Sequence, residues 1–135
     1  MPNIPEVVKK EKKLKTLDRS VTASGLGKFL RGRGPYTFFA PSDSAFKKLG
    51  TESVESLLKP ENKIQLDAFL NQHIIGHRVN FKDLKDGDKL TTMAGKEVTV
   101  KVKGDKVSID GAAILVADVQ SSNGVIHSLD SVLIN

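Results

Sequence analysis

The chain has 135 residues, of which 39% are apolar and 27% are charged, and its formal net charge is +5. These totals are typical of a globular protein with one core and exclude a disordered chain. Because the sequence contains no cysteine, disulfides, thiolate metal sites and thiol catalysis are excluded as well.

The first segment with a clear period runs from Ile4 to Val21. Its apolar residues recur at helical spacing, which predicts one kinked helix or two short ones, and Gly25 and Gly27 end the pattern. Residues 1–13 contain no apolar core of a signal peptide. Lysines fall mostly between the apolar positions, which places them on the outer face: Lys9, Lys10, Lys12 and Lys13.

A short aromatic run, Tyr36–Ala40, predicts a buried strand. Pro41 cannot donate a ladder hydrogen bond, so we expect the strand to stop there. Ser42 is a good helix N-cap, and Asp43 would lie in the positive first turn of the following helix. Gly50 ends that helix. The segment is therefore predicted to be a strand-to-helix corner.

The middle of the chain predicts two further helices. One is short and closes before Pro60. The other has the clearest helical period of the chain, from Leu66 to Ile74, and this places His73 on an apolar helix face before Gly76 ends the pattern.

The period changes from 3.6 to 2 in the C-terminal half. Val98, Val100 and Val102 alternate with polar residues, and turn signals such as Asn123-Gly124 separate the apolar runs. Ile114–Val119 and Leu129–Ile134 are predicted as further strands. Helices followed by a meandering sheet predict an α+β fold, with one domain over residues 1–135 in which residues 1–3 are linker or added residues.

Candidate chemistry is sparse. Ser42, His73 and Asp43 supply the residue types of a hydrolase, but the Gly-x-Ser-x-Gly elbow that exposes a catalytic serine is missing. His73 and His77 have the spacing of a helical metal-ligand pair, with His127 as a distant third, yet Gly76 breaks the helix between the first two. We therefore predict neutral, hydrogen-bonded histidines, no metal and no catalysis.

The lysines of the first segment have two interpretations. They are either a solvated helix face or a patch that binds polyanions. Nucleic acid is not expected as a partner, because one tyrosine and no tryptophan leave few aromatic rings to stack on bases.

Three segments together resemble the signature blocks of fasciclin-type domains, in the same order and at matching spacing. They are Thr37–Phe46 (TFFAPSDSAF), Phe69–Val79 (FLNQHIIGHRV) and Val116–Ile134 (VADVQSSNGVIHSLDSVLI). The resemblance covers essentially the whole chain. The chain is similar to single-domain bacterial or archaeal members of the family. It implies a wedge of β-strands with short α-helices packed on it, no cofactor and no known catalysis.

Individual residues match the family pattern in each block. In the first block these are Thr37, Phe39, Ala40, Pro41, Asp43, Ala45 and Phe46. In the second block His73 matches and is followed by the apolar residues Ile74 and Ile75, and in the third block the matches are Asn123, Gly124, Ile126, His127 and Asp130. Gln72 stands where the family often has tyrosine, and in animal members the tyrosine–histidine pair with its apolar neighbours has been linked to integrin binding.

The resemblance implies a non-enzymatic adhesion module, secreted or at the cell surface, which binds a protein or polysaccharide partner as a monomer. A polyanion-binding protein that uses Lys9, Lys10, Lys12 and Lys13 is the alternative, and a hydrolase is a further one. We also expect His73 to hydrogen-bond into the corner near Asp43, since a buried polar group needs a partner.

Overall fold

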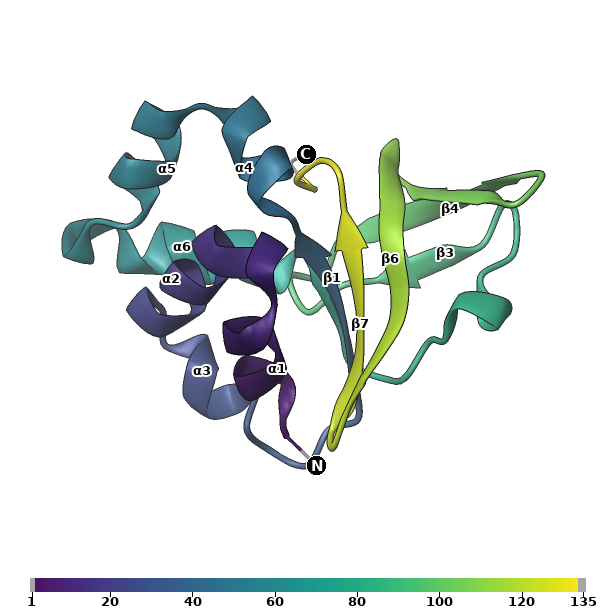
Figure 1. The fold of residues 1–135 in the computed structure, drawn as a ribbon, viewed down its shortest axis with the longest axis horizontal. Coiled ribbons are helices and arrows are strands. Elements are labelled where there is room, and N and C mark those ends of the chain that lie inside the picture. Colours follow the sequence, from purple (N-terminus) through teal and green to yellow (C-terminus); the bar gives the residue numbers. More distant parts are fainter. Residues whose placement is uncertain (1, 134–135) are drawn as a thin grey trace.

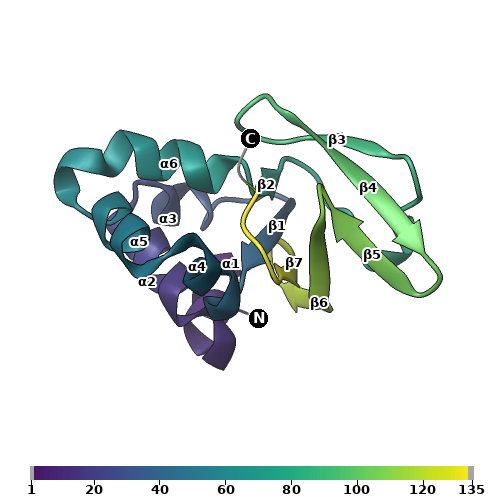
Figure 2. The same cartoon turned by 90° about the horizontal axis from the view of Figure 1, so that it is seen from above.

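The computed structural model describes residues 2–133, and these form a helical layer packed on one side of a curled β-sheet (Figure 1). The view from above shows the helices gathered at one end and strands β3–β5 at the other (Figure 2). The α-helices are α1 (Ile4–Lys10), α2 (Lys15–Ala23), α3 (Leu26–Phe29), α4 (Asp43–Leu49), α5 (Thr51–Leu57) and α6 (Lys63–Asn71). Short 3-10 turns are η1 (Lys12–Leu14), η2 (Pro60–Asn62) and η3 (Phe81–Asp83).

The sheet has seven strands in the order β2-β1-β7-β6-β5-β4-β3. Their bounds are β1 (Tyr36–Pro41), β2 (Ile74–Ile75), β3 (Lys89–Thr91), β4 (Glu97–Lys103), β5 (Lys106–Ile109), β6 (Ala112–Ser121) and β7 (Gly124–Leu129). Strands β3 to β7 follow one another as an antiparallel meander. β1 pairs in parallel with β7, so the N-terminal and C-terminal halves of the chain meet within the sheet, next to its edge strand β2. The α+β prediction is confirmed.

β1 and β7 are buried on both faces, which explains why consecutive residues of β1 such as Phe38 and Phe39 are apolar. Successive side chains of a strand point to opposite faces. Phe38 therefore enters the core under the helices, with Ile4 and Leu17, whereas Phe39 enters a second core inside the curled strands, with Val100.

Most predicted elements are present, including two short helices over residues 4–23 and the corner after β1. Two predicted boundaries are wrong. The helix predicted to reach Ile74 ends at Asn71, and Ile74–Ile75 forms β2. Pairing with β1 explains the difference, because the Phe39 N–H donates to the His73 carbonyl at 2.7 Å in place of a helical bond.

The last strand was predicted over Leu129–Ile134, but β7 spans Gly124–Leu129. It begins at Gly124, directly after Asn123, because residues 124–129 are the ones that reach β1 and complete its parallel ladder. Beyond Leu129 no strand continues through residue 133, and Ile134 lies outside the described residues.

We predict that Gly124→Ala destabilises the protein by about 3 kcal/mol or more. A Cβ built at Gly124 would lie 2.2 Å from the Tyr36 carbonyl oxygen and 2.9 Å from Cδ1 of Ile4, so the central ladder would have to open. Urea unfolding measures the loss. Gly27→Ala is the matched control, since its Cβ would meet nothing closer than 3.6 Å and we expect no loss there. Equal stability of the two variants would contradict this account of the central ladder.

Candidate functional site

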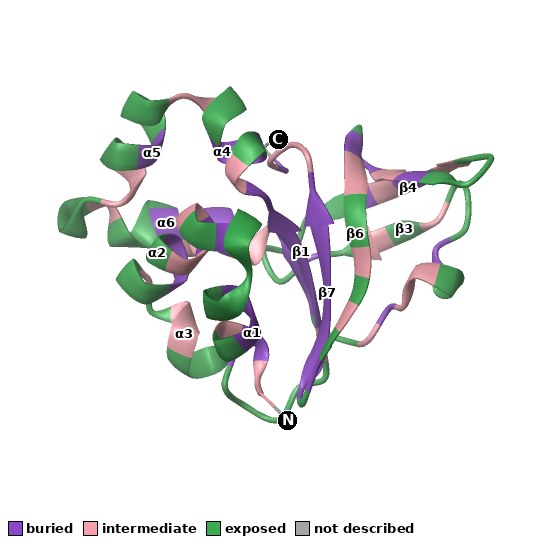
Figure 3. Cartoon of the chain, in the orientation of Figure 1, coloured by how far each residue is buried: buried purple, intermediate pink, exposed green. Residues whose placement is uncertain are grey.

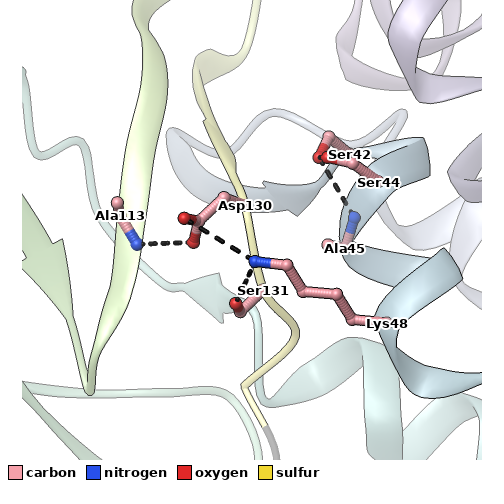
Figure 4. A network of polar contacts seen from close by, with 7 residues as sticks. All are labelled: Ser42, Ser44, Ala45, Lys48, Ala113, Asp130 and Ser131. Carbon is pink, nitrogen blue, oxygen red and sulfur yellow. Dashed lines mark hydrogen bonds and ion pairs between the residues drawn. The ribbon is translucent and has the colours of Figure 1, made fainter.

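The strand-to-helix corner after β1 is closed by hydrogen bonds from its own side chains. The Ser42 hydroxyl accepts from the Ala45 N–H at 3.3 Å, and the Ser42 and Ser44 hydroxyls bond each other at 2.9 Å (Figure 4). The Asp43 carboxylate accepts from the Thr16 N–H at 2.9 Å. Ser42 therefore caps α4 as predicted, while Asp43 connects the corner to α2.

Two other residues of the first block complete the corner. Pro41 is the last residue of β1 and lies opposite Leu129, so the strand ends there as expected. The buried ring of Phe46 stacks on Phe69 of α6, with ring centroids 5.9 Å apart. The corner is thereby joined to the helix that precedes His73.

Asp130 follows the C-terminal end of β7, beside the corner (Figure 4). One of its oxygens accepts from the Ala113 N–H at 2.8 Å, and the other lies 3.8 Å from Nζ of Lys48. Lys48 also donates to the Ser131 hydroxyl at 3.3 Å. Because this ion pair is partly exposed, its contribution is small, and the main effect of Asp130 is to join β6 to the segment after β7.

Asn123 binds two parts of the chain that are distant from it in sequence. Its side-chain amide donates to the carbonyls of Leu30 at 2.5 Å and Gly32 at 2.7 Å, and its oxygen accepts from the Ile4 N–H at 3.1 Å. The β6–β7 turn, the first helix and the loop before β1 are therefore held by one buried side chain.

Thr37 and His127 hold the segment that follows β2. The Thr37 hydroxyl donates to the His77 carbonyl and accepts from the Val79 N–H, both at 2.7 Å. His127 Nδ1 accepts from the Asp118 N–H at 3.1 Å, so its Nε2–H donates to the Val79 carbonyl at 2.8 Å. Burial lowers the pKa of His127 below its usual value, and the hydrogen bond to Val79 and the nearby charge of Asp118 oppose this effect.

His73 does not bond near Asp43, so that prediction is wrong. Its Nε2 accepts from the Leu133 N–H at 2.8 Å, which leaves Nδ1–H to donate to the Phe69 carbonyl at 2.8 Å. The ring is fully buried and stacks on Phe69 at a centroid distance of 4.9 Å. Because α6 ends before His73, the ring turns back over the last turn of that helix, and it reaches the corner only through Phe69.

Burial lowers the pKa of His73 from 6.5 to about 4, against the opposing effect of its hydrogen bond to Phe69. The ring is therefore neutral at physiological pH, and neutrality is what allows Nε2 to accept from Leu133. Its role in the described structure is to join the end of α6 to the C-terminal segment.

The candidate hydrolase residues are not arranged for catalysis. Ser42 caps a helix, Asp43 accepts from a backbone amide, and both ring nitrogens of His73 bond the backbone. Within residues 2–133 no three His, Cys, Asp or Glu side chains converge as metal ligands. In the same range, none of the helices is both long enough and apolar enough to cross a membrane.

The central block is mostly interior. Ile74 and Ile75 are fully buried, as is the Phe39 ring, which stacks on His127 with centroids 5.7 Å apart. At the ends of the block, Gln72 is half-buried and His77 is exposed. A partner that recognises this block would therefore meet its ends, whereas its centre belongs to the two cores.

The predicted lysine positions are all exposed: Lys9, Lys10, Lys12 and Lys13. Three of them border a groove of about 640 Å³ between η1 and strands β6 and β7. The groove also contains Leu115 and Val116, which lie in a predicted strand and were not predicted as site residues. The signal that could have singled them out is the unbroken apolar run Ala112–Ala117, the longest in the C-terminal half of the chain.

Comparison with known proteins identifies the family. The Fasciclin domain profile matches residues 12–135. The chain belongs to the fasciclin domain family. It is 39% identical to Protein sll1483 of Synechocystis over 97% of its own length and 72% of that protein. It is also 37% identical to the pig transforming growth factor-beta-induced protein ig-h3, over 98% of its own length and only 19% of that much longer protein.

A solved structure agrees with this fasciclin assignment at the level of fold. The FAS1 domain pair from the insect cell adhesion molecule Fasciclin I superposes with a TM-score of 0.87 at 16% sequence identity. The match covers 99% of this chain and 51% of that one. The helical layer on a curled sheet is thus the fasciclin fold, and the three blocks of the sequence supply its internal hydrogen bonds.

We predict that acidification destabilises this fasciclin domain through His73. Because the folded pKa is about 4 and the ordinary value is 6.5, the unfolded state binds more protons between these pH values. The contribution of neutral His73 to the free energy of unfolding is therefore present above pH 6.5 and is lost as the pH decreases toward 4. Between about pH 7.5 and about pH 5, His73 alone should remove about 2 kcal/mol, measured by urea unfolding.

The control is His73→Gln, which cannot titrate. It should be less stable than the parent at neutral pH and should show a flatter dependence on pH, with the remainder due to His127, whose pKa is lowered in the same direction. An unchanged pH dependence in His73→Gln would contradict the role assigned to this ring.

Proposed function

We propose that this chain is a non-enzymatic adhesion module, secreted or at the cell surface, which binds a protein or glycan partner through its exposed surface. Its membership of the fasciclin family supports the proposal, as does its likeness in fold to a cell adhesion molecule.

One observation carries the proposal. The polar side chains of the three blocks that are buried in the described structure all use their polar atoms internally, and no buried side-chain nitrogen or oxygen within residues 2–133 lacks a partner. A catalytic site normally keeps polar groups oriented toward an open position for substrate. Here those groups stabilise the fold, so recognition is left to exposed residues.

The surface at the ends of the central block is our first choice for the partner contact. His77 is exposed there, and the half-buried Arg78 donates to the Gln120 side chain at 2.6 Å. Thr37 and His127 hold the backbone beneath these residues in one conformation. A surface that is preorganised in this way loses less entropy when a partner binds.

A polyanion is the second candidate partner, and the lysine positions favour it. Lys9, Lys10, Lys12 and Lys13 are all exposed within five residues of chain, and in the described part of the structure none of them forms an ion pair. Such a cluster attracts anionic polymers, and salt weakens the attraction because each contact releases counterions.

The two candidates predict different responses to salt and to charge reversal. We expect the purified protein, applied to an array of matrix proteins, neutral glycans and acidic glycans, to bind a partner that is retained at high salt. A variant with Lys9, Lys10, Lys12 and Lys13 changed to Glu should bind it equally well. In contrast, the double variant His77→Ala and Arg78→Ala should bind at least tenfold more weakly, or about 1.4 kcal/mol.

The charge control reverses four exposed lysines of β3–β5, namely Lys89, Lys101, Lys103 and Lys106, and so changes the net charge equally. Binding that disappears with salt and with the first set of substitutions, but persists with the second, would establish the lysine cluster as the site and overturn the adhesion proposal. Turnover of an ester or glycoside by the purified chain would overturn it as well.

A further inference from the structure

The groove between η1 and strands β6 and β7 combines an apolar lining with a charged rim. Its volume of about 640 Å³ lies within the range of about 300–1,000 Å³ typical of small-molecule sites. One part of its lining is apolar and comes from both layers of the fold: Leu14, Leu115, Val116, Val119 and Ile126. The other part is charged and comes from the turn between α1 and α2.

The apolar part leaves two large side chains in water. Leu115 is 52% exposed and Val116 is 50% exposed. Within residues 2–133 the other large exposed apolar residues are scattered singly, whereas these two are adjacent. Figure 3 shows the contrast between this exposed stretch of β6 and the fully buried strand β7 beside it. Adjacent exposed apolar side chains in a concave surface indicate a binding site more strongly than single ones.

An irregularity in β6 produces this exposure. The pairing of β6 with β7 shifts register between Ile114 and Val116 and again between Val116 and Val119. Asp118, inside the second shift, has a φ of +57°. In a regular strand Leu115 and Val116 would point to opposite faces, but here both line the groove. Bulges of this kind redirect side chains and are frequent at functional sites.

Polar contacts hold the irregular strand in place. The Val116 N–H donates to the Ser128 hydroxyl at 3.0 Å, and the Asp118 N–H donates to His127 at 3.1 Å. The Asp118 carboxylate accepts from the Phe81 N–H at 2.8 Å. Because neighbouring strands and loops fix the bulge, the two apolar side chains are presented in a defined position.

The rim of the groove is cationic. Lys10, Lys12 and Lys13 line it and are exposed, and Glu11 is the carboxylate among them. Two hydroxyls in the lining are already engaged, since Ser42 caps α4 and Ser128 holds the bulge. The charge available to a ligand at the rim is therefore positive.

From this juxtaposition we propose that the groove binds a free fatty acid. The alkyl chain lies along Leu115, Val116 and Val119, and the carboxylate pairs with the lysines of η1. A cationic rim favours a carboxylate over an alcohol or an amine of the same length. A polysaccharide would leave the apolar lining in contact with polar hydroxyls, so the apolar lining selects a ligand with a hydrocarbon chain.

The first test uses dodecanoate as the probe, kept below its micellar concentration and titrated calorimetrically into the full chain. We expect saturable binding of one dodecanoate per chain. Shortening the acid should weaken binding about tenfold for every two CH₂ groups removed. Dodecyltrimethylammonium, which has the same chain with the opposite charge, should bind at least tenfold more weakly.

Variants place the ligand in the groove. Val116→Asp should weaken dodecanoate binding at least tenfold, and Leu115→Gln is a second, milder variant at the same surface. Ile64→Asp is the matched control, because Ile64 is apolar and 82% exposed but lies outside the groove. Lys12→Glu with Lys13→Glu should weaken dodecanoate binding without weakening the cationic probe, whereas Lys101→Glu with Lys103→Glu should change neither.

Four results would each overturn the proposal. The first is the absence of any heat of binding at every chain length, and the second is equal dodecanoate binding by Val116→Asp, Leu115→Gln and the parent chain. The third is equal affinity for dodecanoate and the cationic probe, and the fourth is cosedimentation with phosphatidylglycerol vesicles that dodecanoate does not compete away. The last result would assign the patch to a membrane surface instead. The chain-length series on the parent protein needs no variant, so the proposal remains testable even if a substitution unfolds the chain.

Discussion

The parallel pairing of β1 with β7 is the contact on which the rest of the structure depends. It joins residues 36–41 to residues 124–129, nearly ninety positions apart, and it divides the interior into a core beneath the helices and a core inside the curled strands. Both strands are buried on both faces, so every residue along them must fit neighbours above and below. The space is smallest at Gly124, where a single added Cβ would collide with the backbone of β1 at Tyr36.

Buried polar side chains connect the outlying segments to this pair of strands. Thr37 and His127 hold the chain after β2, Asn123 holds the first helix and the loop before β1, and His73 holds the C-terminal segment. All of these bonds go to backbone groups, which have no other way to be satisfied once they are buried. In this chain the buried polar residues of the three blocks thus serve largely as partners for backbone groups.

Because the signature residues of this chain are mostly internal, its exposed features are what a partner can contact. They are a lysine-rich turn between α1 and α2, two apolar residues on a bulged strand, and the polar ends of the central block. The first two border the same groove. The central strands and the hydrogen bonds around them provide a rigid base for these surfaces.

Local patterns by themselves determined much of this protein. The α+β class, the corner capped by Ser42 and the outward lysines all follow from periods and caps, which act within a few residues of chain. The local pattern could not decide the element boundaries and hydrogen-bond partners that depend on pairing between distant segments. Ile74 and Ile75 continue a helical period but pair with β1, and His73 bonds Leu133, which comes sixty residues later. The groove likewise exists only because a turn and a bulged strand from opposite ends of the chain are brought together, and only tertiary structure specifies such contacts.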